Sequence, residues 1–324
     1  MPERAPLRML FGRDAWERVR GRIQEAGLAV QPLLLEPDGS LADGDFQAAW
    51  FSPELFALKQ DEAFLAAVLG CPTVRWMQSG RSGFDHPAFA QLARRGVRLS
   101  RSTAPAPAIA EYVIASVFDR FQRGPERRLA QQAQEWRPLP FKEIAGSRWL
   151  CVGFGEIGRE VGRRARALGA HVTGVRRSGG DSDCADLVVT PDRMGDALAA
   201  ADVVVLSVPL TPDNDGSYGR DFFAGFRAGA LFVNVGRGQL LDEPALRAAL
   251  DSGRVGHCVL DVTRVEPLPR GEWQWTHPQV TLTAHTSGIG SGLIGRTDAL
   301  LIENLGRYLS GGPLLHELNP ENFA

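Results

Sequence analysis

The stretch "RWLCVGFGEIGRE", residues 148–160, combines an apolar run, a glycine-rich turn and the start of a helical pattern. Its glycines Gly153, Gly155 and Gly158 have the spacing G-x-G-x-x-G. Between a strand and a helix, this spacing lets backbone N–H groups and a helix N-terminus approach a pyrophosphate. The alternative is a tight turn without a ligand, because a chain with 36 glycines can show this spacing by chance. The flanking strand and helix patterns favour a dinucleotide site, with contacts expected from Gly153, Gly155, Glu156, Ile157 and Gly158.

Short apolar runs alternate with helical patterns on both sides of this turn. The runs are rich in β-branched residues and nearly continuously apolar, as expected of parallel strands that helices cover on both faces. The alternation is clearest after residue 148, but it is already present in the first hundred residues. The expected strands are 7–11, 29–35, 46–51, 73–78, 148–153, 171–176, 202–208, 231–235, 257–262 and 279–284.

Proline and small residues in "RSTAPAPA" (101–108) predict a hinge between two domains. We expect an α/β protein of two flavodoxin/Rossmann-like domains with parallel sheets, the cofactor domain being inserted into the substrate domain. The substrate domain comprises residues 1–102 and is completed by 291–324, and the dinucleotide-binding domain comprises 103–290. A helical stripe over 109–121 follows the hinge, and it belongs either to the core or to a dimer interface.

The composition excludes several classes of partner. With 36 basic and 38 acidic residues among 324, the formal charge is −2, which gives no electrostatic reason to bind nucleic acid or an anionic membrane. No apolar run has the length of a signal peptide or a membrane span. The four scattered cysteines indicate reduced thiols, not a disulfide framework or a zinc site. We therefore expect a cytoplasmic protein with no metal site.

The second strand of the nucleotide-binding unit ends in Arg176, Arg177 and Ser178. An acidic residue at this place would accept a hydrogen bond from the ribose 2′-hydroxyl of NAD. Arginine cannot accept that bond, but it holds a 2′-phosphate through charge-assisted contacts. The alternative is that the arginines are merely solvated at the end of the strand. The sequence favours NADP(H) as the preferred cofactor, with NAD(H) possible.

Polar residues follow three later strands, at the carboxyl edge of the predicted sheet where open α/β sheets bind ligands. The stretches are "NVGRGQLLDE" (234–243), "LDVTRVEPLP" (260–269) and "LTAHTSG" (282–288). Arg237, Glu266 and His285 are therefore expected to converge. Hydride transfer to a 2-keto acid needs a proton donor, a cation for the substrate, and a group that keeps the donor protonated. The alternative for His285 is a structural histidine at a strand end.

These motifs, in this order and spacing, resemble the D-isomer-specific 2-hydroxyacid dehydrogenase family over nearly the whole chain. "AEYV" (110–113), "VPLTPDN" (208–214) and "ENLGRYLSGGPL" (303–314) match as well. Within the family, the chain looks most like glyoxylate/hydroxypyruvate reductases. The resemblance implies an NADP-dependent enzyme that reduces a small 2-keto acid to the D-2-hydroxy acid, and a homodimer.

The resemblance also implies roles for individual residues. His285 would be the general acid/base, Glu266 its carboxylate partner and Arg237 the substrate-binding cation. Asp261 would contact the nicotinamide end, and the further cofactor contacts would be Pro209, Val235, Gly236 and Gly288. Substrate would also meet a loop in "QSGRSGFD" (78–85), through Ser79, Gly80, Arg81, Ser82 and Gly83. Arg81 departs from the family pattern, and it either favours a more acidic substrate or points to solvent.

Two other classes remain at this point. A non-catalytic NAD(P)-sensing protein on the same fold could retain Arg237, Glu266 and His285. A different Rossmann enzyme, such as a methyltransferase, would usually have an acid at the end of the second strand. Such an enzyme would not need the three stretches at 234–243, 260–269 and 282–288 together.

Overall fold

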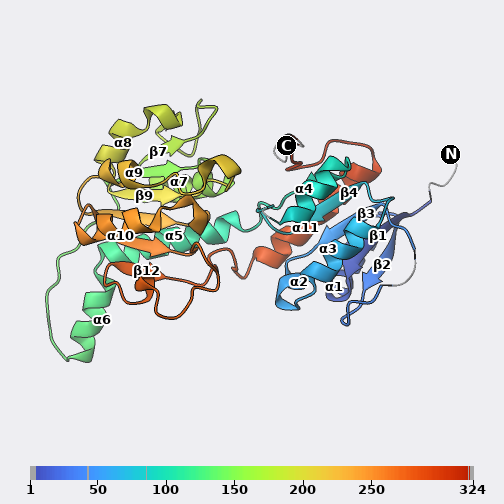
Figure 1. The fold of residues 1–324 in the computed structure, drawn as a ribbon, viewed down its shortest axis with the longest axis horizontal. Helices are drawn as coiled ribbons and strands as arrows, with labels where there is room; N and C mark the ends of the chain where they lie inside the picture. The colour runs from blue at the N-terminus through green and yellow to red at the C-terminus, as the bar shows by residue number, and fades with distance from the viewer. Residues whose placement is uncertain (1–4, 42–43, 85, 320, 322–324) are drawn as a thin grey trace. The chain divides into compact units, whose positions relative to one another are not determined.

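The computed structural model describes residues 5–41, 44–84, 86–319 and 321. Asp85, the last residue of the expected substrate loop, lies outside the described residues, as do residues 1–4 at the N-terminus. The chain forms two compact units (Figure 1): unit 1 is Met1–Pro105 with Ser291–Ala324, and unit 2 is Ala106–Gly290. The division between them thus lies within the stretch 101–108.

Unit 1 is built on a five-stranded parallel sheet with the order β2-β1-β3-β4-β5. Successive strand residues alternate between two buried clusters: Trp76 packs with α1 and α11, whereas Met77 packs with α3 and α4. Helices therefore cover both faces of the sheet. The elements are β1 (Leu7–Gly12), α1 (Arg13–Glu25), β2 (Val30–Leu35), β3 (Ala48–Phe51), α2 (Glu54–Ala57), α3 (Asp61–Gly70), β4 (Trp76–Ser79), α4 (Pro87–Arg94), β5 (Arg98–Ser100) and α11 (Leu293–Leu309).

Unit 2 contains a seven-stranded parallel sheet with the order β12-β11-β10-β9-β6-β7-β8. Helices α5 and α7 pack on one face, and α8, α9 and α10 on the other. The elements are α5 (Ala106–Phe121), α6 (Gly124–Gln132), β6 (Arg148–Val152), α7 (Glu156–Ala167), β7 (His171–Val175), β8 (Leu187–Val189), α8 (Gly195–Ala200), β9 (Val203–Leu206), α9 (Arg220–Ala224), β10 (Ala230–Asn234), α10 (Glu243–Asp251), β11 (Val255–Leu260) and β12 (Val280–Leu282).

The predicted α/β class with parallel sheets is confirmed. The stripe of α5 lies in the core of unit 2, because Ile109, Val113, Val117 and Phe121 are all buried against the sheet and α7. Asp242 caps α10 as its sequence pattern indicates, by accepting a hydrogen bond from the N–H of Ala245 at 3.0 Å.

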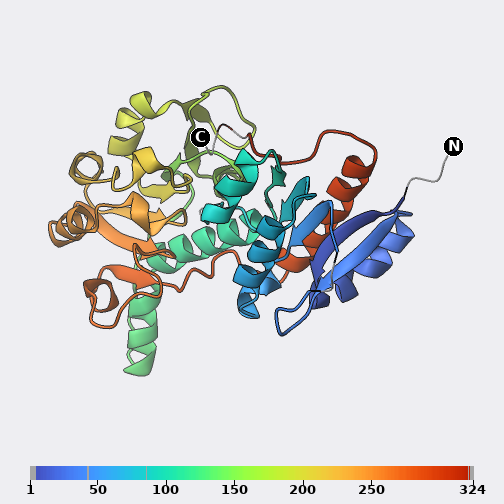
Figure 2. The same cartoon turned by 45° about the vertical axis from the view of Figure 1, so that its right-hand side comes forward.

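Strands β5 and β8 and helix α6 are among the elements that had no counterpart among the expected ones. Strands β5 and β8 have only three residues each, too few to show a period. Helix α6 projects from the rest of unit 2 in both views (Figures 1 and 2) and buries a single residue, Ala130. Within the described ranges, no helix has both the length and the apolar character needed to cross a membrane.

The order of strands in unit 2 marks the edge at which open α/β sheets bind ligands. The chain runs from β6 to β7 on one side and then returns to β9 on the other side of β6. A crevice opens at such a reversal, at the carboxyl ends of the strands. The glycine-rich turn follows β6 there, and the loops that carry Arg237, Glu266 and His285 follow β10, β11 and β12 at the same edge.

Candidate active site

Two glycines of the turn between β6 and α7 are required by the backbone. Gly153 has a φ of +94°, and a Cβ at this position would lie 2.7 Å from the backbone of Ser207. A Cβ at Gly158 would lie 2.3 Å from the carbonyl oxygen of Gly153 and would push α7 away from the turn. At Gly155, by contrast, a Cβ would meet nothing within 4 Å. The turn leaves open space at the N-terminus of α7, and this fits a pyrophosphate.

The three residues that follow β7 differ in their contacts and in their exposure. The guanidinium of Arg176 turns back onto its own loop, where Nε donates to the carbonyl oxygen of Gly179 at 2.5 Å and Nη2 to that of Asp181 at 3.2 Å. Arg177 and Ser178 are exposed at the same strand end. Arg176 therefore shapes the loop, while Arg177 and Ser178 are the more accessible groups for a phosphate.

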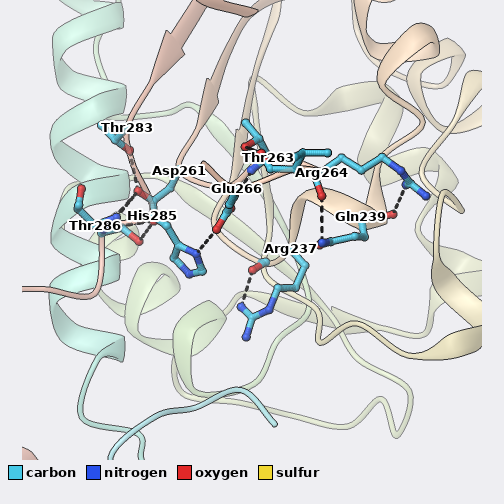
Figure 3. A network of polar contacts seen from close by, with 12 residues as sticks. Arg237, Gln239, Asp261, Thr263, Arg264, Glu266, Thr283, His285 and Thr286 are labelled. Atoms are coloured by element: carbon cyan, nitrogen blue, oxygen red, sulfur yellow. Dashed lines mark hydrogen bonds and ion pairs between the residues drawn. The ribbon is translucent and has the colours of Figure 1, made fainter. Parts of the chain in front are cut away.

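His285 and Glu266 form a hydrogen-bonded pair (Figure 3). Nδ1 of His285 lies 2.8 Å from Oε2 of Glu266, and Oε1 of Glu266 accepts a hydrogen bond from the N–H of Thr263 at 3.0 Å. Burial acts to raise the pKa of the Glu266 carboxyl. The hydrogen bonds from His285 and Thr263, together with the charges of His285 and Arg237, outweigh burial and lower that pKa below its ordinary value.

An ionised Glu266 determines which nitrogen of His285 can react. A carboxylate only accepts hydrogen bonds, so Nδ1 of the imidazole carries a proton and donates it to Glu266. Nε2 is then the nitrogen that can give a proton to a substrate or take one from it. The side chain of His285 is 40% exposed, so a ligand can reach the ring.

The side chain of Arg237 lies beside this pair (Figure 3), and its Nη1 donates to the carbonyl oxygen of Gly236 at 2.8 Å. The buried side chain of Asn234 at the end of β10 holds the turn. Its Nδ2 donates to the carbonyl oxygen of Arg237 at 3.0 Å, and its Oδ1 accepts from the N–H of Gly236 at 3.0 Å. The Arg237 backbone is thus fixed from within the sheet.

The loops of Arg237 and Glu266 pack backbone against backbone. A Cβ at Gly238 would lie 2.0 Å from the carbonyl carbon of Thr263 and 2.4 Å from the nitrogen of Arg264. Hydrogen bonds join the same two loops, since Nε2 of Gln239 donates to the carbonyl oxygen of Arg264 at 3.1 Å and Nη1 of Arg264 donates back to that of Gln239 at 3.2 Å. The separation of the two loops is therefore fixed.

Asp261 is 1% exposed, directly after β11. Its carboxylate accepts hydrogen bonds from the hydroxyl of Thr283 at 2.6 Å, from the N–H of Thr286 at 2.9 Å, and from the N–H and hydroxyl of Ser287. Its backbone oxygen accepts from the N–H of His285 at 2.8 Å. Asp261 therefore organises the loop of the histidine, and a contact with nicotinamide would be added to a carboxylate that already has several donors.

The other expected cofactor contacts lie at the same edge of the sheet. Val235 and Gly236 are buried after β10, and the side chain of Val235 belongs to the core. Pro209 follows β9, and its carbonyl oxygen accepts from Nδ2 of Asn214 at 2.9 Å. Gly288 is half-buried after the histidine loop.

The expected substrate loop belongs to unit 1, whereas Arg237, Glu266 and His285 belong to unit 2. Ser79 ends β4, and its hydroxyl accepts from the N–H of Arg81 at 3.1 Å. Gly80 has no room for a side chain, because a Cβ there would lie 2.6 Å from Pro53. The guanidinium of Arg81 stacks on the ring of Phe56 at 3.8 Å. Ser82 and Gly83 are half-buried in the same loop.

The residues missed in the sequence are those that hold the loops. Asn234 stands within a quoted motif, and a buried polar residue at a strand end is a signal that could have found it. Tyr112 and Thr283 contact each other at 2.8 Å across 171 positions of the chain, and no local pattern indicates such a contact. Among the described residues, no group of three or more His, Cys, Asp or Glu side chains could hold a metal ion.

Comparison with known proteins gives one family. Residues 114–287, more than half of the chain, match the model of the D-isomer specific 2-hydroxyacid dehydrogenase, NAD binding domain. The glyoxylate/hydroxypyruvate reductase A of Serratia proteamaculans is 33% identical over 196 residues, which is 60% of this chain and 63% of that relative. The glyoxylate reductase/hydroxypyruvate reductase of Homo sapiens is 27% identical over 258 residues, covering 73% of this chain and 74% of the human protein.

Solved structures share the fold along almost the whole chain. The NADPH-dependent glyoxylate/hydroxypyruvate reductase of Sinorhizobium meliloti, in complex with NADP and sulfate, has a TM-score of 0.78 at 24% identity, over 99% of this chain and 100% of that one. A D-isomer specific 2-hydroxyacid dehydrogenase of Xanthobacter autotrophicus, in complex with NADPH and MES, has a TM-score of 0.79 at 24% identity with the same coverage. At these identities, the likeness to both structures establishes the fold alone.

Proposed function

This chain belongs to the D-isomer specific 2-hydroxyacid dehydrogenase family and is an NAD(P)-dependent oxidoreductase, and we propose that it reduces glyoxylate or hydroxypyruvate with NADPH to the corresponding D-2-hydroxy acid. One observation carries the proposal. The hydrogen-bonded pair of His285 and Glu266 lies beside Arg237 at the carboxyl edge of a nucleotide-binding sheet. This arrangement has the proton donor, the carboxylate and the cation that reduction of a keto acid needs.

The residues act on the substrate in different ways. Arg237 offers a planar, charged donor to the substrate carboxylate. Nε2 of a protonated His285 gives its proton to the carbonyl oxygen as negative charge develops there. Glu266 stabilises the imidazolium before the transfer and keeps Nδ1 as a donor throughout. In the oxidising direction, neutral His285 takes the proton back from the hydroxyl.

The cofactor would supply the hydride, and the residues present fit it. The open face of Gly155 and the N-terminus of α7 would hold the pyrophosphate. Arg177 and Ser178 would hold the 2′-phosphate, with Arg176 keeping their loop in shape. The relatives solved with NADP or NADPH support this preference, and NAD(H) remains a second cofactor of the same site.

The loop Ser79–Gly83 of unit 1 is proposed to bind substrate as well. Its positive residue, Arg81, already stacks on Phe56, which sequesters part of the guanidinium face. We therefore expect Arg81 to attract a second acidic group on the substrate less strongly than an unstacked arginine would. This favours a small keto acid as substrate. The names of the relatives point to glyoxylate and hydroxypyruvate as the first compounds to test.

We also propose a cytoplasmic homodimer. The four cysteines are free and buried, which suits a reducing compartment. Helix α6 and the segment after it expose large apolar side chains: Leu129 is 63% exposed, Trp136 100% and Phe141 51%. A second copy of the chain would cover them. Sedimentation of the parent protein and of Trp136→Ser tests this. We expect the parent to sediment as a dimer and the variant to dissociate more readily. A parent that sediments as a monomer would contradict the proposal.

The function is tested by following NADPH or NADH absorbance with glyoxylate, hydroxypyruvate, pyruvate and a dicarboxylic keto acid in parallel. We expect the highest kcat/KM with NADPH and either glyoxylate or hydroxypyruvate, and formation of the D-enantiomer where the product is chiral. Cofactor binding without turnover of any of these acids would overturn the proposal.

A further inference from the structure

The motif "AEYV" (110–113) has no part in the chemistry described above, yet it leads to the catalytic loop. The hydroxyl of Tyr112 on α5 lies 2.8 Å from Oγ1 of Thr283. Oγ1 of Thr283 lies 2.6 Å from Oδ1 of Asp261. Three polar groups from a helix, a strand end and a neighbouring strand end thus form one continuous chain inside unit 2. In Figure 3, Thr283 and Asp261 lie beside a helix at the edge of the view.

The direction of these hydrogen bonds follows from the last acceptor. An ionised carboxylate only accepts, so Thr283 donates its hydroxyl proton to Asp261. Oγ1 of Thr283 has no second proton, and Tyr112 must therefore donate to it. The ordinary state of Tyr112 suits this role, because burial, the largest effect, raises the pKa of its hydroxyl despite the hydrogen bond to Thr283, and the phenol stays protonated. The result is a directed relay: Tyr112 to Thr283 to Asp261.

The loop at the end of this relay needs to be held. His285 has a φ of +53°, a left-handed conformation that is uncommon outside glycine and costs free energy unless neighbouring contacts impose it. Those contacts come from Asp261: its backbone oxygen accepts from the N–H of His285, and its carboxylate accepts from the N–H groups of Thr286 and Ser287. Rotation of the Asp261 carboxylate would release the N–H groups of Thr286 and Ser287, the two residues that follow His285 in the loop. The relay fixes the rotation by occupying Oδ1 from the side of α5.

We propose that Tyr112 is a positioning residue for the reaction, which acts through Thr283 and Asp261 to hold the strained loop that presents His285. The effect on turnover rests on the proposed function. The effect on the loop does not, because the hydrogen bonds belong to the chain alone. The two are therefore measured separately.

Four variants test the relay. Tyr112→Phe removes only the first hydroxyl, Thr283→Val removes the central donor at similar volume, and Thr283→Ser restores that donor. Tyr218→Phe is the matched control, because Tyr218 is a half-buried tyrosine of the same unit whose pKa burial alone raises. Loss of one neutral hydrogen bond is expected to lower kcat about three- to tenfold for Tyr112→Phe. Thr283→Val is expected to lose about ten- to 100-fold, and Thr283→Ser to stay within about threefold of the parent.

Two results separate positioning from a general structural role. Because Tyr112 acts through Thr283, the double variant Tyr112→Phe/Thr283→Val should be no slower than Thr283→Val alone. The affinity for NADPH and the melting temperature should change little in Tyr112→Phe. A double variant whose loss is the product of the two single losses would overturn the relay.

The second measurement needs no turnover. Deuterium exchange followed by mass spectrometry reports the amides of Thr286 and Ser287, which donate to Asp261. We expect faster exchange in the peptide over 284–288 for Tyr112→Phe and Thr283→Val, and parent-like exchange for Thr283→Ser and Tyr218→Phe. If the parent protein reduces no keto acid but exchange behaves in this way, the proposed function fails and the relay stands. Exchange that is unchanged in Thr283→Val overturns the relay whatever the activity.

Discussion

Replacing Gly238 by alanine tests whether the spacing of the loops that carry Arg237 and Glu266 matters for the proposed reaction. The new Cβ would lie 2.0 Å from the carbonyl carbon of Thr263 and 2.4 Å from the nitrogen of Arg264. Both are backbone atoms, so no side chain can swing aside, and ordinary contact begins at 3.4 Å. The loops of Arg237 and Glu266 must therefore separate by about 1 Å or more, and a displacement of about 1 Å in an active site can cost on the order of 100-fold in rate.

The assay is kcat/KM for NADPH-dependent reduction of glyoxylate or hydroxypyruvate by Gly238→Ala. Gly195→Ala is the control, since an added Cβ there meets nothing within 4 Å and lies in the same unit. We expect a loss of about 100-fold at Gly238 with a smaller change in NADPH affinity, and parent-like kinetics at Gly195. Circular dichroism distinguishes a displaced loop from an unfolded chain. Parent-like kinetics of a folded Gly238→Ala would refute the reasoning.

Three further changes have defined outcomes. Arg177→Ala should raise the KM for NADPH about tenfold or more and leave the KM for NADH little changed. Arg176→Ala should raise the KM for both cofactors, because the side chain of Arg176 holds the loop. Steady-state kinetics with both cofactors checks both expectations. Glu266→Gln replaces a carboxylate that only accepts hydrogen bonds by an amide that can also donate, so the proton on Nδ1 of His285 is no longer fixed and kcat of reduction should fall about tenfold or more, as steady-state kinetics would show. Burial raises the pKa of Asp202, but Lys142 and the backbone N–H of Arg148 lower it more, so the folded carboxyl titrates below its unfolded pKa of about 4. Asp202→Asn should therefore cost about 2–3 kcal/mol at pH 7 and less as the pH falls through the folded pKa, as measured by urea unfolding at both ends.

The fold was predictable where its signal is local. The turn at 151–158 and the continuously apolar strands around it are short-range patterns, and the parallel sheet of unit 2 follows from them. Strand β8 was not predictable, because its apolar run, Leu187–Val189, has only three residues and is too short to show the period of a strand. Helix α6 was missed for a related reason, since a helix that buries only Ala130 lacks the apolar stripe that marks the others.

The candidate site, too, was predictable only where its signal is local or follows from the general form of a parallel sheet. That Arg237, Glu266 and His285 meet follows from a general property of parallel sheets, whose carboxyl ends lie at one edge. The direction of the Arg176 side chain did not follow, because it depends on carbonyl oxygens of a loop whose path only the folded chain fixes. The contact of Tyr112 with Thr283 is likewise set by the packing of α5 on the sheet.

The most direct test of the central claim, that His285 supplies the proton as a small keto acid is reduced, is a comparison of the parent with His285→Asn. The measurement is single-turnover oxidation of bound NADPH by glyoxylate or hydroxypyruvate near neutral pH, with cofactor binding measured separately by fluorescence. We expect His285→Asn to bind NADPH like the parent and to react about 100- to 10,000-fold more slowly, the range for loss of a general acid. Equal single-turnover rates in the two proteins would contradict the account.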